Sequence, residues 1–255
     1  MSAFLHRLDS LVTSPAAQHI ATAWRGMTNL LIPNPCALCI WSDAEIHQLC
    51  RVCLGLSKEQ TRQIIQAQDF ADALPLDLVT GQPLPVFAAS FYTPEMAKLA
   101  LNFKDHQRIK LARAFRPIMY RTLQHAAAHL GSSHYRLVPI PASGASMRKR
   151  GYNPVTTMLP RRLPGALAYD AGLLKTRWQI FAQTSHHGTG VQARRAASQK
   201  KFRLAHRHVP PAEPVILIDD VLTTGATLGA ATKLLQSAGF DVAAAVVLSA
   251  VMPRS

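Results

Sequence analysis

The sequence predicts an α/β protein, in which a parallel sheet flanked by helices follows a small N-terminal module of helices and a cysteine knuckle. Short apolar runs at 136–141, 214–220 and 241–250 have the length of buried strands. The last two are separated by a stretch with helical periodicity, and strand, helix and strand in that order favour a right-handed parallel crossover. All four cysteines lie near the N-terminus, apart from these runs.

The composition is that of a folded chain. Of its 255 residues, 48% are hydrophobic and 16% are charged, and the charged share is below the roughly 25% of average soluble domains. No apolar run approaches the roughly 20 residues that span a bilayer. The first 26 residues are interrupted by Arg7, Asp9, His19 and Arg25 and lack the core of a signal peptide. We therefore expect a cytoplasmic protein without a membrane span.

Positive charge is concentrated in the middle of the chain. The net charge is +14, and 19 of the 28 Lys and Arg residues lie between Asp105 and Glu213, where Asp170 is the single carboxylate. Such a field attracts phosphates or nucleic acid. The alternative is a basic surface that serves solubility alone.

Cysteines form two C-x2-C pairs within one 18-residue segment: Cys36, Cys39, Cys50 and Cys53. Two such pairs can present four thiolates to one tetrahedral Zn²⁺, with no position left for water, so the site is expected to be structural. Disulfides are disfavoured in a reducing compartment, and a redox motif needs no duplicate. His47 is expected to be a surface residue.

Before the sheet, we expect one or two amphipathic helices over residues 1–30 and a helix over 58–70. The Pro- and Gly-containing stretch 75–85 is typical of a linker. We therefore divide the chain into an N-terminal module, 1–80, which contains the knuckle at 36–53, and a second domain, 86–255.

The second domain is expected to begin with a strand at 86–92. Thr93 and Pro94 then suit the N-cap and first position of a helix, and a further helix is expected over about 108–128. The buried side of the first helix is predicted to comprise Met96, Leu99, Ala100 and Phe103. A last helix is expected from about Gly225 to Gly239, with inward-facing Leu228, Ala231, Leu234, Leu235 and Ala238.

Two adjacent carboxylates, Asp219 and Asp220, end the apolar run at 214–220. In parallel sheets ligands bind beyond the carboxyl ends of the strands. The turn that follows combines free N–H groups at a helix start with hydroxyls and a glycine, which suits a phosphate; it comprises Thr223, Thr224, Gly225, Ala226 and Thr227. The carboxylates suit the hydroxyls of a ribose with Mg²⁺ close by. The alternative is that these residues only cap a strand and a helix.

The segment VILIDDVLTTGAT resembles the phosphoribosyl-pyrophosphate (PRPP) signature of type I phosphoribosyltransferases. Together with LLIPNPCALC, FYTPEMAKLALNFKDHQ and VPIPASGASMRKRGYNP, in that order, it resembles the ComF family. The resemblance covers most of 29–250. It implies a zinc module joined to a type I phosphoribosyltransferase-like domain, PRPP with Mg²⁺ as ligand, and an association with DNA uptake in natural competence.

A pyrophosphate loop is expected after the strand at 136–141, since small residues let backbone N–H groups approach an anion and guanidinium groups suit phosphate. Its candidates are Ala142, Ser143, Gly144, Arg148, Lys149 and Arg150. The alternative is a solvated basic turn. Lys104 matches a family lysine and could contact phosphate or lie exposed at a helix end. The family's histidine after this strand is absent here, and Pro154 replaces its glutamine, which weakens the case for turnover more than for binding.

Three functions are compatible with these features: an accessory protein of DNA uptake, an active phosphoribosyltransferase of the pentosyltransferase class, or a PRPP-responsive regulator without turnover. No catalytic acid or base can be assigned. The expected partners are PRPP, single-stranded DNA and proteins of the competence machinery. The segment 194–210 could contact a nucleic-acid backbone, with Phe202 as its stacking aromatic, or form a basic surface helix. His186 and His187 are expected to be surface residues.

Overall fold

A computed structural model describes residues 34–77, 80–106, 108–132, 134–163, 166–177, 201–205 and 212–252. The helices expected over 1–30, the pair His186 and His187, and most of the basic segment 194–210 lie outside these ranges. Among the helices of the described residues, none combines the length and the apolar character that crossing a membrane requires.

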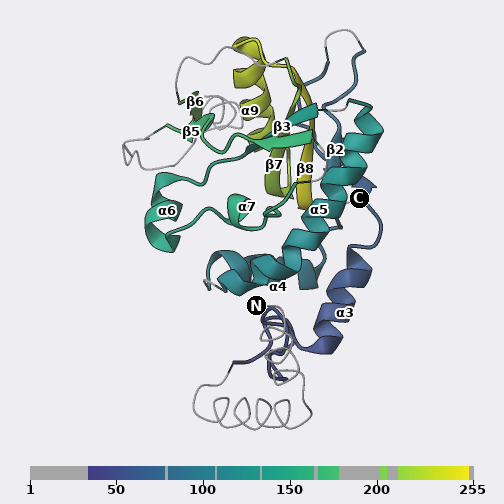
Figure 1. Cartoon of the computed structure of the whole chain (residues 1–255), viewed down its shortest axis with the longest axis vertical. Helices are drawn as coiled ribbons and strands as arrows, with labels where there is room; N and C mark the ends of the chain where they lie inside the picture. The colour runs from purple at the N-terminus through teal and green to yellow at the C-terminus, as the bar shows by residue number, and fades with distance from the viewer. Residues whose placement is uncertain are drawn as a thin grey trace, which may run out of the picture.

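Helices and strands alternate along the described residues (Figure 1). In chain order they are α3 (Arg51–Gln60), β1 (Ile65–Gln66), the 3-10 turn η1 (Gln68–Phe70), β2 (Val86–Ala88), α4 (Pro94–Lys104), the 3-10 turn η2 (Ile109–Leu111), α5 (Ala112–Leu130), β3 (His134–Pro139), α6 (Gly144–Arg150), α7 (Pro154–Thr157), β4 (Ala166–Tyr169), β5 (Leu174–Thr176), β6 (Phe202–Leu204), β7 (Val215–Leu222), α9 (Ala226–Ser237) and β8 (Val242–Ala250).

The main sheet has six strands in the order β1-β2-β8-β7-β3-β4. Strands β2, β8, β7, β3 and β4 run parallel, and only β1 is antiparallel to its neighbour. β5 and β6 form a separate antiparallel pair. The predicted fold class, a mostly parallel sheet flanked by helices with a four-cysteine cluster in the N-terminal region, is confirmed.

Each face of the sheet has its own apolar core. One face packs against α4, α5 and the cysteine segment, and the other packs against α9 and the β5–β6 pair. On β7, Ile216 and Ile218 face the first core, while Val215 and Leu217 face the second. Because side chains alternate along a strand, this pattern also decides where the next residues of β7 point.

The crossover and the cap of α4 are as predicted. β7, α9 and β8 follow in order and the two strands pair in parallel. The hydroxyl of Thr93 accepts a hydrogen bond from the backbone N–H of Met96 at 3.3 Å, and Pro94 occupies the first turn. The four side chains predicted to be buried on this helix are buried. On α9, Leu228, Ala231 and Leu235 are buried, and Leu234 and Ala238 pack at the edge of the core.

Three expected elements have different bounds. The helix predicted over 58–70 begins at Arg51 and ends at Gln60, because the chain then turns to place β1 beside β2. The strand predicted over 86–92 ends at Ala88. The region from Ala142 to Arg150 is not a loop throughout, since Gly144–Arg150 form α6 with Ser143 as N-cap.

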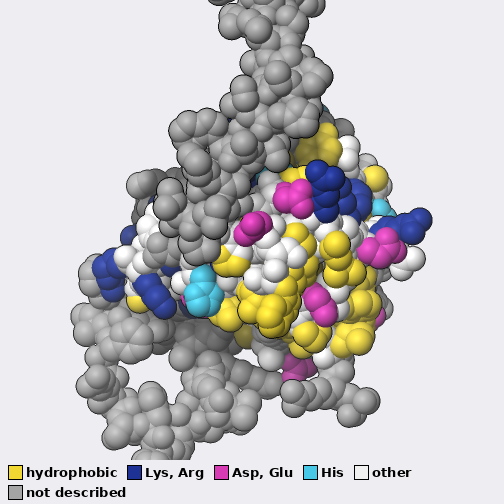
Figure 2. Space-filling view, turned by 90° about the horizontal axis from the view of Figure 1, so that it is seen from below, with side chains coloured by type: hydrophobic (Ala, Val, Ile, Leu, Met, Phe, Trp, Pro, Cys, Tyr) yellow, Lys and Arg dark blue, Asp and Glu magenta, His cyan; other side chains and the backbone are white. Residues whose placement is uncertain are grey.

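The cysteine segment packs on α4 and α5 at the lower end of the molecule (Figure 1). The side-chain amide of Asn102 donates to the carbonyl of Ala37 at 2.9 Å, and Arg108 donates to the carbonyl of Pro35 at 2.6 Å. Seen from below, hydrophobic side chains gather at the surface (Figure 2). Two exposed apolar side chains of the cysteine segment are Trp41, which is 90% exposed, and Val52, which is 72% exposed.

Candidate functional site

An open pocket of about 390 Å³ lies beyond the carboxyl end of β3, beside β7. Side chains from several elements line it: Lys104 of α4; Ile140, Pro141, Ala142 and Ser143 after β3; Ser146 and Arg150 of α6; Asn153, Pro154 and Val155; Lys201; Asp219, Asp220 and Val221 of β7; and Thr223 and Thr227 around the start of α9. The pocket therefore combines carboxylates, hydroxyls and three cationic side chains.

The two carboxylates lie inside β7 and not at its end. The strand continues to Leu222, which pairs with Ala250 of β8, whereas pairing with β3 stops at Ile218. The ladder alternates, so Asp219 follows the register of Leu217 and Asp220 that of Ile218. The adjacent carboxylates thus leave the strand on opposite sides, which reduces their mutual repulsion and leaves both at the pocket.

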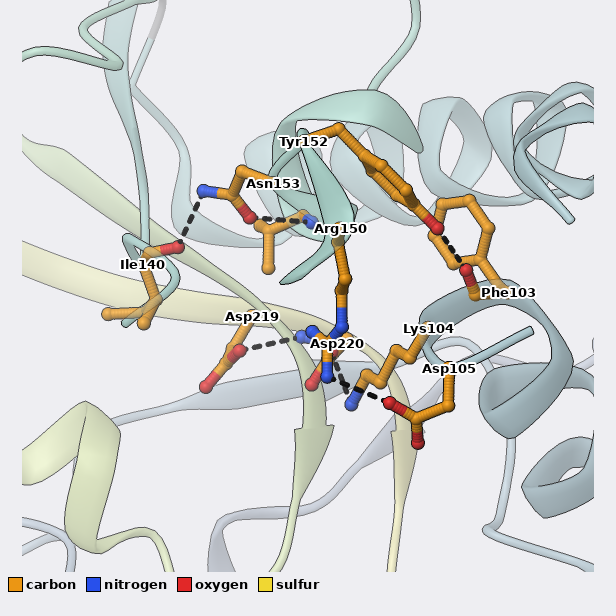
Figure 3. Close-up of polar contacts among 10 residues, drawn as sticks. Phe103, Lys104, Asp105, Ile140, Arg150, Tyr152, Asn153, Asp219 and Asp220 are labelled. Atoms are coloured by element: carbon orange, nitrogen blue, oxygen red, sulfur yellow. Dashed lines mark hydrogen bonds and ion pairs between the residues drawn. The ribbon is translucent and has the colours of Figure 1, made fainter. Parts of the chain in front are cut away.

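Their environments differ. Asp219 is 9% exposed, and one of its oxygens accepts a hydrogen bond from the backbone N–H of Asp220 at 2.9 Å. Burial, with the charge of Asp220 as the second cause, raises the pKa of Asp219 to about 7. Asp220 forms an ion pair with Lys104 of α4, with 2.5 Å between Nζ and the carboxylate oxygen (Figure 3).

Two further cations border the pocket from other elements. Arg150, the last residue of α6, pairs with Asp105 at 3.1 Å, and its side chain is 17% exposed. Lys201 donates to the hydroxyl of Thr227 at 3.2 Å. Because Lys104, Arg150 and Lys201 come from three distant parts of the chain, the positive charge of the pocket is created by folding.

The threonine turn has the conformation that its glycine suggested. Gly225 has φ of 79°, in the left-handed region, and a Cβ there would lie 2.9 Å from Leu74. The hydroxyls of Thr223 and Thr227 line the pocket. Thr224 is turned to the backbone instead, since its hydroxyl accepts from the N–H of Ala226 at 3.4 Å.

The opposite wall is held by side chains that bond to the backbone. Ser143 caps α6 by accepting from the N–H of Ser146 at 3.1 Å. Asn153 donates to the carbonyl of Ile140 at 3.2 Å and accepts from the N–H of Val155 at 3.0 Å (Figure 3). Tyr152 donates its hydroxyl hydrogen bond to the carbonyl of Phe103 and so ties this wall to the end of α4.

Only part of the predicted ligand set reaches the pocket. Its lining includes Asp219, Asp220, Thr223 and Thr227, and, from the expected pyrophosphate loop, Ala142, Ser143 and Arg150. The lining does not include Thr224, Gly225, Ala226, Gly144, Arg148 or Lys149. A helix turns successive residues by about 100°, so formation of α6 aims Arg150, but not its two neighbours, at the pocket.

Sequence reasoning assigned no pocket role to Ser146 or Lys201, and it left Lys104 undecided. The N-cap at Thr93 locates the start of α4, but the direction in which Lys104 points at the end of this helix depends on tertiary packing. The sequence left open whether Phe202 could stack on nucleic-acid bases. The structure contradicts this alternative, because Phe202 is 2% exposed and belongs to the core beneath α9.

The four cysteines lie together. The sulfur atoms of four cysteines all lie within 4.8 Å of one another: Cys36, Cys39, Cys50 and Cys53. The sulfurs of Cys39 and Cys50 are 3.9 Å apart. Tetrahedral zinc with Zn–S of about 2.3 Å requires sulfurs about 3.8 Å apart. The donor set and its spacing therefore fit a Zn²⁺ ion.

Backbone amides already favour thiolate at this cluster. The N–H groups of Leu38 and Cys50 each donate to the sulfur of Cys36 at 3.4 Å. Burial acts to raise the pKa of Cys36, but these amides outweigh it and the pKa is lowered. A backbone hydrogen bond from Ser42 lowers the pKa of Cys39 to about 6. Burial raises the pKa of Cys53, so a cation is needed to make all four sulfurs thiolates.

Parts of the chain are similar to two known proteins. No family model matches the chain. Forty residues, 16% of the chain, are 60% identical to an adenine phosphoribosyltransferase from Polynucleobacter asymbioticus, and the match spans only 23% of that relative. A match to a hypoxanthine phosphoribosyltransferase from Staphylococcus aureus covers 54% of this chain and 62% of that protein's chain, at 16% identity and a TM-score of 0.30. The likeness in sequence is therefore local, and it covers 40 residues of a phosphoribosyltransferase.

Proposed function

We propose that this protein binds PRPP with Mg²⁺ in the pocket between β3, β7 and α4. The proposal rests on one observation: the two carboxylates of β7 and three cationic side chains line the same pocket. Asp219 and Asp220 would hold the ribose hydroxyls and the metal, whose preferred ligands are carboxylate and phosphate oxygens. Thr223 and Thr227 would receive the 5′-phosphate.

On the other side of the pocket, the pyrophosphate would meet Ser143, Ser146 and the guanidinium of Arg150. The Nε of Arg150 is buried and has no hydrogen-bond partner among the described residues. A buried donor without an acceptor is costly, and a diphosphate oxygen would satisfy it. This unsatisfied donor supports an anionic ligand on the α6 side.

Calorimetric titration with PRPP and Mg²⁺ tests the proposal. The zinc-loaded protein is compared with the double variant Asp219→Asn/Asp220→Asn and with Asp241→Asn, an exposed carboxylate at the amino end of β8. We expect saturable binding that only the double variant loses. The proposal is wrong if the folded wild type does not bind, or if the double variant binds as tightly as Asp241→Asn.

Resemblance to the ComF family adds a biological setting to this proposal, an accessory role in DNA uptake. It rests on the order of the motifs and on the excess of Lys and Arg between Asp105 and Glu213. Strongly salt-dependent binding of single-stranded DNA would support this role, and binding that does not respond to salt would count against direct contact with DNA.

Turnover is a separate question from binding. Release of pyrophosphate from PRPP on addition of a base or another nucleophilic acceptor would identify an active phosphoribosyltransferase. Tight binding without consumption of PRPP, together with altered affinity for a protein partner, would identify a regulator.

A further inference from the structure

Two ion pairs cross from the end of α4 to the pocket, and they involve adjacent residues. Lys104 pairs with Asp220 of β7 at 2.5 Å, and Asp105 pairs with Arg150 of α6 at 3.1 Å (Figure 3). Lys104 and Asp220 both line the pocket, on the proposed ribose side, and Arg150 lines it on the proposed diphosphate side. The end of α4 therefore supplies a cation where a bound metal would lie and an anion where a diphosphate would lie.

Contacts on both sides hold the backbone at the end of α4. Tyr152 donates its hydroxyl hydrogen bond to the carbonyl of Phe103, and its ring lies 5.9 Å from the ring of Phe103. Asn102 is held by the carbonyl of Ala37. The backbone that carries Lys104 and Asp105 is thus anchored on both sides, whereas their long or charged side chains can exchange partners by rotation alone.

We propose that Lys104 and Asp105 act as an internal stand-in for metal and diphosphate, and that Lys104 thereby determines specificity for metal-bound diphosphate esters. This inference rests on the proposed function. A ligand displaces Lys104 from Asp220 only if it brings a cation for that carboxylate, and it must offer an anion that accepts the released ammonium. Mg²⁺ with a diphosphate satisfies both conditions, and it also draws Arg150 away from Asp105.

A phosphomonoester such as ribose 5-phosphate does not satisfy both of these conditions. Its single phosphate is taken up on the threonine side, so the α6 side lacks an acceptor for Arg150. The Lys104–Asp220 pair is then broken without a new partner for the ammonium. Lys104 consequently opposes binding of the monophosphate and favours the metal-bound diphosphate.

Binding constants for three probes test the exchange: PRPP, ribose 5-phosphate and inorganic pyrophosphate, each with Mg²⁺. The variants are Lys104→Met, which keeps the apolar stem, Lys104→Arg, which restores the charge, and Asp105→Asn. The control is Lys98→Met, an exposed lysine on the same helix. A charge-assisted hydrogen bond contributes about tenfold or more in affinity.

We expect Lys104→Met to weaken PRPP and pyrophosphate by about tenfold, while ribose 5-phosphate binds as before or more tightly. Lys104→Arg should recover part of the loss. Asp105→Asn should tighten pyrophosphate, since Arg150 loses its competing partner. Lys98→Met should match the wild type for all three probes.

Failure of this inference is distinguishable from failure of the proposed function. If wild type binds PRPP and Lys104→Met changes the affinities for PRPP and ribose 5-phosphate equally, the stand-in role is wrong and the proposed function stands. If wild type binds pyrophosphate in a Lys104-dependent way but not PRPP, the exchange holds and the ribose assignment is wrong. If it binds none of the three probes, both are wrong.

Discussion

The cysteine cluster and the pocket beyond the carboxyl end of β3 are two sites built in different ways. The cluster draws its four sulfurs from 18 consecutive residues and brings them within 4.8 Å of one another. The pocket draws its lining from residues as far apart as Lys104 and Thr227. A local site depends on the backbone of one loop, whereas the pocket exists only after strands distant in sequence have paired. Substitutions at the two sites should therefore differ in how much they change the unfolding free energy and in whether they also change ligand binding.

Loss of a cysteine should have the largest effect. Cys36 is 0% exposed and belongs to the core shared with α4 and α5. Because a structural zinc site contributes directly to folding, Cys36→Ser should lose stoichiometric zinc and about 4 kcal/mol or more of unfolding free energy. Metal analysis and chemical denaturation measure both. Ser42→Ala, an exposed position in the same loop, should change neither; a Cys36→Ser variant with full zinc content would contradict the cluster.

A close backbone approach beneath the pocket is the next most sensitive point. A Cβ at Gly229 on α9 would lie 2.5 Å from the carbonyl oxygen of Ala73. Gly229→Ala should lower the unfolding free energy by about 2 kcal/mol and weaken PRPP binding through displacement of α9. Gly55→Ala on α3, where nothing lies within 4 Å, should be neutral or slightly stabilising. Equal stability of the two variants would contradict this packing.

Asp219 should make the stability of the ligand-free protein depend on pH. Its pKa in the folded protein, about 7, lies above the ordinary aspartate pKa of 3.8 that applies in the unfolded chain. Between these values the unfolded chain has lost the proton that the folded protein keeps, so stability falls as pH rises from about 4 to about 7 and stays lower above. Asp219→Asn should therefore stabilise the protein at pH 8 more than at pH 5, by about 1 kcal/mol or more.

Denaturation at the two pH values checks this difference, with Asp241→Asn as the exposed control. A gain in stability that is the same at pH 5 and pH 8 would show that Asp219 titrates normally. The same ionisation should strengthen binding of PRPP with Mg²⁺ as pH rises through about 7, because the metal requires carboxylate.

The smallest effect is expected in the cysteine loop. Ile40 has φ of 63° and is 56% exposed. The left-handed region costs a β-branched residue about 1–2 kcal/mol. A glycine at this position would remove that cost, but its greater conformational freedom in the unfolded chain would offset part of the gain in stability. Ile40→Gly should raise the unfolding free energy by about 0.5 kcal/mol. Ile46→Gly, at an exposed residue without positive φ, should lower it.

Much of the fold could be predicted from local pattern. The cap formed by Thr93 and Pro94 places the start of α4, the apolar runs give β3, β7 and β8, and Gly225 precedes α9. The prediction displaced the helix at Arg51–Gln60 because the turn after Gln60, which places β1 beside β2, depends on pairing with a distant strand. The division between 1–80 and 86–255 and the ligand roles of the pocket residues stay predictions.

The sequence by itself determined the cysteine spacing, the strand–helix–strand crossover and the adjacent carboxylates, since each depends on residues close in the chain. Tertiary structure alone decided which cations face those carboxylates. Arg150 reaches the pocket because β3 pairs with β7, although 76 positions separate the end of β3 at Pro139 from the start of β7 at Val215. Lys104 reaches the pocket because α4 packs on one face of that sheet. No local pattern encodes such convergence, because it arises from non-sequential strand order and from the burial of apolar surface on both faces.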